Sequence, residues 1–401
     1  MINIILFDNE ARDRLLPLTY LKPVSELRMG ILSIQEKWEK RLGGKVSFAT
    51  KDYLAEKYPI DYGTENYFIN GSALPSDQLC RLIQQMDFND AFLKDDELIA
   101  TKLSEEQFEH LINDEDFDDL NVIPLGDTDF IKINHPWDIF KYNQRAIEED
   151  FQILTKGRKS QRLSPSNQVI GAENIFLEEG ASVECAILNA SEGPIYIGKN
   201  AKIMEGCLLR GPIAIGEGSV LKMGAKIYGG TSVGPYCKVG GEVKNVVFQG
   251  HSNKGHDGYL GDSVIGEWCN IGAGSNNSNL KNNYAEVKLW DYSSERFINT
   301  GQQFCGMIMG DHSKLGIGTT INTGTVIGVS CNIFGSGFPR NFIPSFSWGG
   351  AHGFTTYRTE KAFETVERVY ERRKKEFSVQ DRLILLRVFE DTVQRRPWEK
   401  K

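Results

Sequence analysis

An aliphatic residue recurs at every sixth position over a long stretch in the second half of the chain. The repeat runs without a break through Ile197, Ile203, Leu209, Ile215, Leu221, Ile227, Val233 and Val239. It returns at Ile265 and Ile271, and again at Leu315, Ile321, Ile327 and Ile333. A period of six matches neither the period of about 3.6 of an α-helix nor the two-residue alternation of a half-buried strand.

This period predicts an all-β solenoid of stacked coils. Each coil has short flat sides, one inward aliphatic residue per side, and corners that tolerate glycine. Thirty-three of the forty glycines follow residue 165, and many come directly after the aliphatic residue: Gly198, Gly216, Gly234, Gly240, Gly266, Gly272, Gly316 and Gly328. Stacked coils bury one continuous aliphatic column. A β-sandwich is the alternative, but its strands would show a period of two.

The first 165 residues follow a different pattern. Short apolar runs at Asn3–Phe7, Lys45–Ala49 and Tyr67–Ile69 accompany helical patterns at Ile31–Arg41 and Pro136–Gln152. This alternation predicts a Rossmann-like α/β domain. The composition of residues 155–165 is that of a linker. The predicted limits are therefore 1–154 for the α/β domain, 155–165 for the linker, 166–338 for the solenoid and 339–401 for a C-terminal loop and helices.

The C-terminal segment predicts a cover for the last coil. After an aromatic loop at 338–350, Thr359 is expected to cap a helix with an apolar face of Phe363, Val366, Val369 and Tyr370. Ser378 is expected to open a second helix that runs toward Arg396. Such helices would cover the exposed end of a solenoid. Alternatively, the basic residues 372–375 could meet the acidic front domain of a neighbouring molecule.

Composition indicates a protein of the cytoplasm. Hydrophobic residues make up 40% and charged residues 25% of the chain, and no run approaches the roughly 18 apolar residues of a membrane span. The first eight residues are too short and too soon charged for a secretory signal. The seven cysteines form no CxxC pair, which indicates reduced, mostly buried thiols rather than a disulfide framework or a metal site.

The negative charge is concentrated in one segment. The net charge is −8, and residues 87–119 hold thirteen acids but only Lys94 and Lys102 as bases. Such a run usually forms a solvated face. It argues against nucleic acid as the main partner, because phosphate backbones require a basic surface.

Three short motifs lie in, or directly after, the first break of the six-residue repeat. They are Gly241-Glu-Val-Lys-Asn245, Asn253-Lys-Gly-His-Asp-Gly-Tyr-Leu-Gly-Asp262 and Asn270-Ile-Gly-Ala-Gly274, followed by Asn279. In this combination, residues 166–338 resemble the acetyltransferase half of the bifunctional glucosamine-1-phosphate acetyltransferase/uridylyltransferase family. The resemblance implies a left-handed parallel β-helix, homotrimers with active sites between neighbouring subunits, and acetyl-CoA as co-substrate.

The resemblance places a catalytic base at His256. Acetyl transfer from a thioester to a sugar amine requires a base, and histidine titrates nearest neutral pH. His251, His312 and His352 are the alternative bases, but none lies in a comparable motif.

Other site residues follow from the same resemblance. Lys244 and Tyr259 would hold the sugar phosphate, Asn270 and Asn279 the sugar and the cofactor arm, and the backbone at Ala273 and Gly274 the acyl donor. The chain departs from the family pattern at three positions. Lys226 replaces an arginine, Ala285 replaces a lysine for which Lys288 is the nearest substitute, and Ile317 replaces a serine.

Residues 7–24 resemble the signature loop of sugar-phosphate nucleotidyltransferases. Arg14, Leu15, Pro17, Leu18, Thr19 and Lys22 keep the family frame, and Arg14 and Lys22 would contact a nucleotide. Glu10 and Arg12, however, replace glycines whose backbone amides would approach the phosphates. The family's metal-binding aspartate is matched only by Asn70, whereas Asn134, in a matching Asn-x-Pro-x-Asp segment, is a candidate Mg²⁺ ligand.

The sequence therefore predicts a transferase of nucleotide-sugar biosynthesis. The leading hypothesis is acetyl-CoA-dependent N-acetylation of an amino-sugar 1-phosphate by the β-helix, with nucleotidyl transfer from a nucleoside triphosphate as a second activity of the front domain. One alternative is a uridylyl- or thymidylyltransferase whose β-helix only assembles the oligomer. The other is a non-catalytic regulatory protein that retains both folds. Neither nucleic acid nor a membrane is expected as a partner.

Overall fold

The computed structural model describes residues 2–112 and 120–399 of the chain. By contacts it divides into two compact units. The first comprises Met1–Leu15, Lys22–Leu27 and Leu32–Asn134, and the second comprises Leu16–Leu21, Arg28–Ile31 and His135–Lys401. Among the described residues, no helix has the length and apolar character to cross a membrane.

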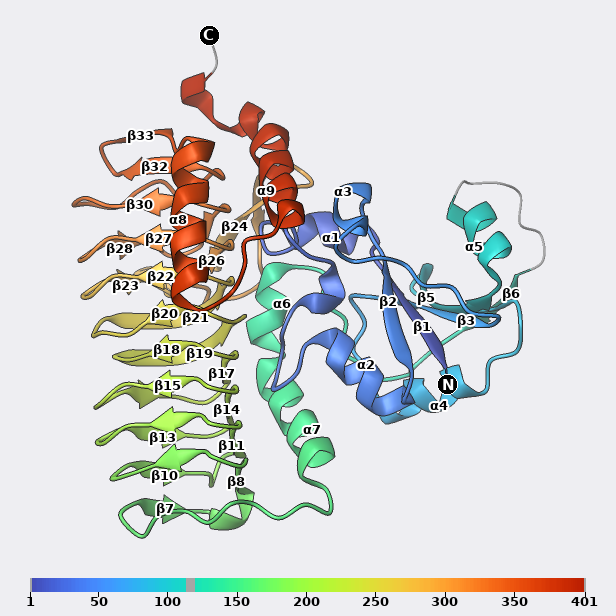
Figure 1. Ribbon diagram of the computed structural model, residues 1–401, viewed down its shortest axis with the longest axis horizontal. Coiled ribbons are helices and arrows are strands. Elements are labelled where there is room, and N and C mark those ends of the chain that lie inside the picture. The colour runs from blue at the N-terminus through green and yellow to red at the C-terminus, as the bar shows by residue number, and fades with distance from the viewer. Residues whose placement is uncertain (1, 113–119, 400–401) are drawn as a thin grey trace. The chain divides into compact units, whose positions relative to one another are not determined.

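A six-stranded mixed sheet forms the centre of the first unit (Figure 1). Its strands are β1 (Asn3–Phe7), β2 (Lys45–Ala49), β3 (Asn66–Asn70), β4 (Asp90–Lys94), β5 (Glu97–Leu103) and β6 (Asn121–Pro124), in the order β2-β1-β3-β5-β4-β6. The parallel strands β2, β1 and β3 coincide with the three predicted apolar runs. The prediction of an α/β domain is confirmed.

Short helices accompany this sheet. They are α1 (Ala11–Arg14), α2 (Ile34–Leu42), α3 (Asp52–Ala55), α4 (Asp77–Gln84) and α5 (Glu105–Ile112), with the 3-10 turn η1 (Val24–Glu26). Helix α2 begins with a capping box of Ser33 and Glu36 and ends at Gly43, whose φ of +69° suits glycine. The predicted acidic face falls on β4, β5 and α5, and its last seven residues, 113–119, lie outside the described residues.

The second unit is a left-handed parallel β-helix, as the sequence predicts (Figure 1). Its short strands pair with the equivalent strands of neighbouring coils: β7 (Gln168–Ile170), β8 (Ile175–Leu177), β9 (Ser182–Val183), β10 (Ile187–Asn189), β11 (Ile195–Ile197), β12 (Lys202–Ile203), β13 (Leu208–Arg210), β14 (Ile213–Ile215), β15 (Val220–Leu221), β16 (Lys226–Ile227), β17 (Thr231–Val233), β18 (Lys238–Val239), β19 (Glu242–Phe248), β20 (Asn253–Lys254), β21 (Tyr259–Ile265), β22 (Asn270–Ile271), β23 (Asn276–Asn277), β26 (Met307–Met309), β27 (Lys314–Leu315), β28 (Thr320–Ile321), β29 (Thr325–Ile327), β30 (Asn332–Ile333) and β31 (Phe342–Ile343).

Two antiparallel pairs complete the strands of the second unit. The pair β24 (Lys288–Asp291) and β25 (Arg296–Asn299) is an inserted hairpin. The pair β32 (Ser347–Gly350) and β33 (Gly353–Thr356) ends the solenoid, because β32 still pairs with β30.

All of the predicted aliphatic positions are buried in one continuous core. The glycines that follow these aliphatic residues, such as Gly216 and Gly234, do not have positive φ, so backbone conformation is not the reason for them. A Cβ atom added at Gly216 or Gly234 would come within 2.7 or 2.3 Å of backbone atoms of the next coil. These glycines therefore permit the close stacking of coils.

One corner of the helix carries residues other than glycine in the left-handed conformation. Tyr236, His251, Trp268 and His312 have φ between +53° and +63°, and their rings stack in successive coils. The ring stack offsets the strain of this conformation in non-glycine residues.

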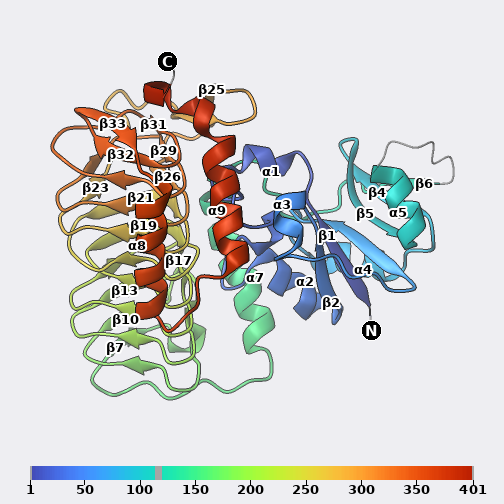
Figure 2. The same ribbon diagram turned by 45° about the horizontal axis from the view of Figure 1, so that its top comes forward.

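Within the described residues, four helices belong to the second unit. They are α6 (Pro136–Lys141), α7 (Asn143–Thr155), α8 (Thr359–Arg372) and α9 (Val379–Asp391), and the short turns η2 (Ala172–Asn174), η3 (Val393–Arg395) and η4 (Pro397–Glu399) are 3-10. Figure 2 shows α8 beside the coils, where Tyr370 stacks on Trp268 with ring centres 4.2 Å apart. Helix α8 thus lies beside the coils rather than over the last coil, where the sequence analysis places it (Figure 1). Ser378 and Asp381 form the expected capping box of α9.

The prediction that Thr359 caps α8 is wrong. Arg358 occupies the N-cap position without a side-chain cap, and Thr359 is the first helical residue. The predicted domain limits, with a boundary at 154/155, stay predictions. The contacts group α6 and α7 with the β-helix, whereas the sequence places them in the front domain.

Candidate active site

The segment from Lys226 to Asn279 carries the candidate residues of the β-helix. Strands β19 and β21 are parallel and pair at six positions, so that Glu242 lies opposite Tyr259 and Lys244 opposite Gly261. Strand β20 precedes the turn that leads into β21. His256 lies in that turn and its side chain is exposed.

A buried lysine holds the turn that carries His256. Lys254 pairs in register with Val239 and therefore occupies an inward position of the aliphatic column, where only 1% of it is exposed. Its ammonium donates to the carbonyl oxygens of Gly240 and His256, each at 2.9 Å. Burial lowers the pKa of Lys254 to about 8.

Four polar side chains form a hydrogen-bonded network over Gly261. The Asn279 amide donates to the Tyr259 hydroxyl at 3.0 Å and to the Asp262 carboxylate at 2.6 Å. Asn245 donates to the other oxygen of Asp262 at 2.8 Å. A Cβ atom at residue 261 would lie 2.4 Å from the Tyr259 hydroxyl, so the network requires glycine there.

Burial sets the protonation of this network. It raises the pKa of Tyr259 to about 12, with the charge of Asp262 as the next cause. The phenol therefore stays protonated at neutral pH and can donate a hydrogen bond. Burial also raises the pKa of Asp262, opposed by the hydrogen bonds from Asn245 and Asn279 and by the charge of Lys244.

The two predicted phosphate-binding lysines lie on the same sheet as Tyr259. Lys244 is exposed, with its ammonium 5.6 Å from the centre of the Phe304 ring. Lys226 is paired in register with Glu242, which is paired in turn with Tyr259, so Lys226 lies two coils from the tyrosine. The structure thus brings Lys244, Tyr259 and Asn279 together, with Lys226 further along the same face.

The remaining predicted residues lie on another side of the coil. Asn270 is exposed on β22, in register with Asn253 of β20. The amide of Gly274 donates to the Asp257 carbonyl at 3.0 Å, which joins it to the turn of His256. Because that N–H is already used, Ala273 is the better candidate for a backbone donor to a ligand. Ile317 is 83% exposed and brings no polar group.

The alternative histidines have other surroundings. His251 and His312 stack on the ring of Trp268, with centres 4.1 and 6.5 Å away, inside the aromatic corner. His352 is exposed near the end of the solenoid, between β32 and β33. His256, unlike these three histidines, lies in the turn that leads to Tyr259 of the polar network.

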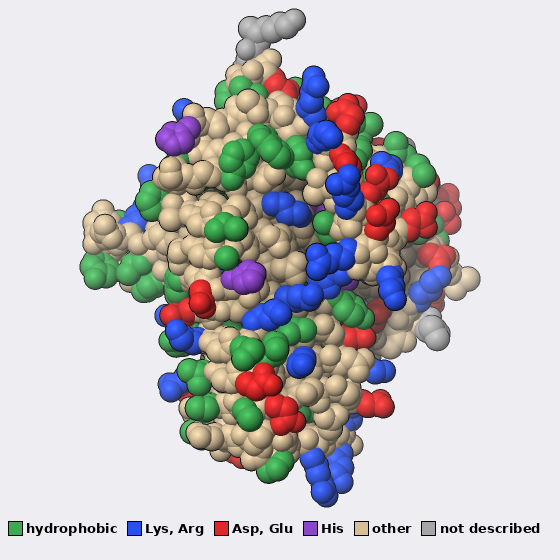
Figure 3. Space-filling model, turned by 60° about the vertical axis from the view of Figure 1, so that its left-hand side comes forward, with side chains coloured by type: hydrophobic (Ala, Val, Ile, Leu, Met, Phe, Trp, Pro, Cys, Tyr) green, Lys and Arg blue, Asp and Glu red, His purple; other side chains and the backbone are tan. Residues whose placement is uncertain are grey.

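Cations gather beside the turn of His256. Burial lowers the pKa of Lys238, and the like charges of Arg373, Lys222 and Arg372 lower it further. The Arg373 guanidinium also donates to the side chain of Asn253 at 3.3 Å. Lys and Arg side chains form a band across the face seen in Figure 3. Like charges held together in this way favour an anionic ligand.

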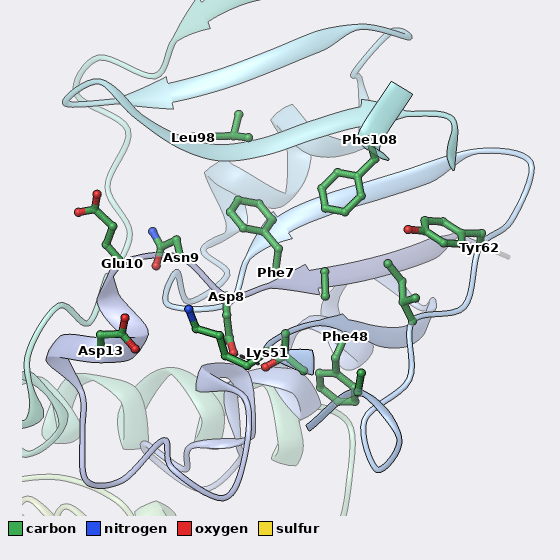
Figure 4. A pocket seen from close by; sticks show the side chains of 14 residues that line it. Phe7, Asp8, Asn9, Glu10, Asp13, Phe48, Lys51, Tyr62, Leu98 and Phe108 are labelled. Atoms are coloured by element: carbon green, nitrogen blue, oxygen red, sulfur yellow. Dashed lines mark hydrogen bonds between the residues drawn. The ribbon is translucent and has the colours of Figure 1, made fainter. Parts of the chain in front are cut away.

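The first unit has a separate hollow of about 600 Å³ at the ends of β1 and β2 (Figure 4). Phe7, Phe48 and Phe108 line its apolar part, and Lys51 is its one cation in the part of the chain that the structure describes. Three acids also line it: Asp8, Glu10 and Asp13. These carboxylates oppose the binding of a triphosphate.

The predicted nucleotide contacts are engaged within the protein. Arg14 pairs with Glu10 at 3.3 Å, and the buried Arg12 pairs with Asp8 at 3.5 Å. Lys22 is buried, with 4% of its surface exposed. Glu10 and Arg12, which stand where the family has glycines, thus form ion pairs within the protein. Their partners, Arg14 and Asp8, are then less available to a nucleotide.

The surroundings of Asn134 do not fit Mg²⁺. The ammonium of Lys132 donates to Oδ1 of Asn134 at 2.8 Å and to the carboxylate of Glu97. Asn70 directs its amide nitrogen, rather than an oxygen, to Glu97 at 3.1 Å. A lysine ammonium therefore occupies the centre of the group, and no cluster of three His, Cys, Asp or Glu suits a metal elsewhere in residues 2–112 and 120–399.

Comparisons with known proteins agree with this architecture. Residues 4–159 match the model of the sugar nucleotidyl transferase family. The chain is 27% identical over 216 residues to the bifunctional protein GlmU of Wigglesworthia glossinidia brevipalpis, a match that covers 46% of this chain and 45% of that protein. The chain is therefore similar, over part of its length, to the sugar nucleotidyl transferase family and to GlmU proteins.

Two further relatives are also bifunctional proteins or GlmU. A bifunctional sugar-1-phosphate nucleotidylyltransferase/acetyltransferase of Sulfurisphaera tokodaii is 39% identical over 93 residues, which cover 23% of each chain. GlmU of Methanocaldococcus jannaschii is 27% identical over 199 residues, which cover 50% of this chain and 42% of that protein. The chain thus spans less than half the length of these three relatives.

The GlmU-like motifs did not indicate every residue of the network. Lys254, Asp262, Asn245 and Phe304 were assigned no role from the sequence. A lysine at an inward register position could have been found by counting from Val239, had the length of that coil been known. Asp262 has a φ of +45°, a conformation that aspartate tolerates better than most residues, but such a corner is not visible in the pattern.

Proposed function

We propose that the β-helix transfers an acetyl group from acetyl-CoA to the amine of an amino-sugar 1-phosphate. The observation that carries this proposal is the joining of Lys244, Tyr259 and Asn279 in one polar surface, next to the exposed turn of His256. This surface offers a cation and neutral donors, which suit a sugar phosphate. His256 precedes Tyr259 by three residues, in the turn that leads into β21.

In this reaction His256 acts as the general base. The amine nitrogen attacks the thioester carbonyl carbon, and the imidazole takes a proton from that nitrogen. The resulting tetrahedral intermediate carries a negative oxygen, for which the Ala273 amide is the candidate donor. The carbon–sulfur bond then breaks, and the His256 imidazolium returns its proton to the leaving thiolate.

Lys244 and Tyr259 bind the sugar phosphate, with Lys226 as a more distant cation. Tyr259 accepts from Asn279 and keeps its own proton at neutral pH, so its hydroxyl can donate to a phosphate oxygen. Asn270 contacts the sugar from the neighbouring side of the coil. The cluster of Lys222, Lys238, Arg372 and Arg373 supplies further positive charge beside the turn of His256.

Thiol release tests the proposal. The protein is mixed with acetyl-CoA and glucosamine 1-phosphate, and free CoA is measured with a thiol reagent. His256→Ala should reduce the rate by about 10²–10⁴-fold. His352→Ala, which removes another exposed imidazole, is the matched control and should leave the rate unchanged. Equal rates for wild type and His256→Ala would refute the assignment of the base.

A homotrimer with sites between subunits remains part of the proposal. Sedimentation of the purified protein checks the trimer. Nucleotidyl transfer by the first unit is expected to be weak or absent, because Glu10, Asp13 and the group around Lys132 oppose both the triphosphate and the metal.

A further inference from the structure

An inserted hairpin borders a hollow that none of the motifs explains. Strands β24 and β25 pair with Lys288 opposite Asn299 and Trp290 opposite Phe297. Between this hairpin and β31 lies a hollow of about 730 Å³ in the second unit. Its lining comprises Lys281, Lys288, Trp290, Phe297, Thr323, Arg340, Asn341 and Phe342.

The hollow is positively charged. Lys281, Lys288 and Arg340 line it, and no aspartate or glutamate of the described residues does so. The Lys281 ammonium donates to the Glu286 carbonyl at 2.7 Å. Lys288 and Arg340 are exposed and form no ion pair with the residues that the structure describes. Three cations around one hollow repel each other unless an anion joins them.

One wall of the hollow is aromatic. Trp290 and Phe342 stack with centres 4.3 Å apart and planes at 14°, and Phe297 meets Trp290 edge-on at 5.4 Å. Phe297 is 42% exposed. The stack on Phe342 fixes the hairpin to β31, but it does not explain the exposed Phe297 or the cations. An inorganic anion would use the cations alone, whereas a planar ring with a phosphate would use both groups.

We infer that this hollow binds a nucleoside phosphate, with its ring on the aromatic wall and its phosphate among Lys281, Lys288 and Arg340. Arg340 offers a bidentate fork for a phosphate, and the lysines are compact charges beside it. The Asn341 amide and the Thr323 hydroxyl are the neutral polar groups of the lining.

The hollow adjoins the proposed acetyl-transfer site. The Thr323 hydroxyl donates to that of Ser278 at 2.7 Å, directly before Asn279. Leu280 bridges to Phe304, the ring beside the Lys244 ammonium. The bound nucleoside phosphate therefore belongs to a molecule that reaches Asn279. It is either the nucleotide of a nucleotide-linked amino sugar or the nucleotide end of acetyl-CoA, and this choice rests on the proposed function.

Direct binding distinguishes the two sources. Calorimetric titrations use UDP, adenosine 3′,5′-bisphosphate and inorganic phosphate as probes. We expect one of the two nucleotides to bind, and the preferred one identifies the source. Lys288→Ala combined with Arg340→Ala should weaken that binding at least tenfold, whereas Lys199→Ala, an exposed lysine of another coil, should not change it.

A second variant separates ring from phosphate. Phe297→Ala removes an exposed ring and should weaken nucleotide binding several-fold without changing the binding of inorganic phosphate. Equal unfolding midpoints show that the variants are folded. Failure of both nucleotides to bind, or equal binding by wild type and the double variant, overturns the inference. So does a double variant that changes the sedimentation coefficient but not nucleotide affinity, since the hollow is then a subunit contact.

The same variants separate this inference from the proposed function. In one outcome, the wild type releases thiol with glucosamine 1-phosphate but binds no nucleotide, and the double variant has unchanged KM values. This outcome would overturn the inference and leave the proposed function standing. In the opposite outcome, the wild type binds a nucleotide, the double variant loses this binding, and no amino sugar is acetylated. This outcome would uphold the inference and refute the proposed function.

Discussion

Replacing Lys254 by methionine tests the electrostatics of the β-helix core. The ammonium of Lys254 is buried among aliphatic residues, and its pKa is lowered to about 8 from 10.5. Methionine has a similar unbranched shape without a charge. The variant loses two hydrogen bonds from a charged donor, about 1.5–3 kcal/mol each, and it also avoids the desolvation of the ammonium.

The pH dependence of this difference has a definite sign. Between about pH 8 and 10.5 the unfolded chain still binds the lysine proton while the native protein has released it, so stability rises with pH in this window. At about 1.36 kcal/mol per pKa unit, wild type gains about 2 kcal/mol relative to Lys254→Met between pH 7 and pH 9.5. The buried cysteines Cys237 and Cys269, with pKa values of about 12, have the opposite trend, but they cancel because both proteins contain them.

Chemical unfolding at the two pH values measures this gain. Lys202→Met, at an exposed position of β12, is the matched control and should show no change of the difference with pH. A difference between wild type and Lys254→Met that stays constant from pH 7 to 9.5 would refute the buried-ammonium argument. The variant should also release the turn of His256, so its acetyl-transfer rate should fall even where its stability equals that of wild type.

Three further predictions concern other parts of the chain. Tyr259→Phe removes one donor to the phosphate and should raise the KM for the sugar phosphate about tenfold while that for acetyl-CoA stays constant; equal effects on both would contradict the assignment. A thiol reagent should label Cys185 in the native protein and the other six cysteines only after denaturation, because Cys185 is the exposed one; Cys185→Ser should therefore remove the background of the thiol-release assay. Magnesium chloride should not raise the unfolding midpoint of wild type, and Lys132→Met should lower stability by about 1–3 kcal/mol because Glu97 loses its cation; a midpoint that rises with magnesium would count against the ammonium at Asn134.

The six-residue repeat was sufficient to predict the β-helix, because each coil contributes the same inward aliphatic residue. It was not sufficient at the site, where the coils change length. Leu221 pairs with Val239, eighteen residues later, but Val239 pairs with Lys254 after only fifteen. The shorter coil moves a lysine into the core, and no count from the regular repeat reaches it.

The inserted segment between β23 and β26 limited prediction in a similar way. Asn277 is buried at an inward position in register with Ile321, and its side chain bonds to both the N–H and the carbonyl of Gly261. An amide side chain thus replaces strand pairing where the chain leaves the coil. Motifs indicated the residues on either side, but only coordinates show that Asn279 then reaches Asp262.

The first unit keeps a family frame in which charged residues pair with one another. A site for a phosphate and a metal contains charged side chains, and a buried charge without a partner costs free energy when no ligand is bound. Here Glu10 pairs with Arg14, and Lys132 lies between Glu97 and Asn134, so each charge has an internal partner. Such pairs remove the dependence of stability on a ligand. Because these pairs also occupy the groups that would bind a ligand, they are the physical reason to expect weak or absent nucleotidyl transfer.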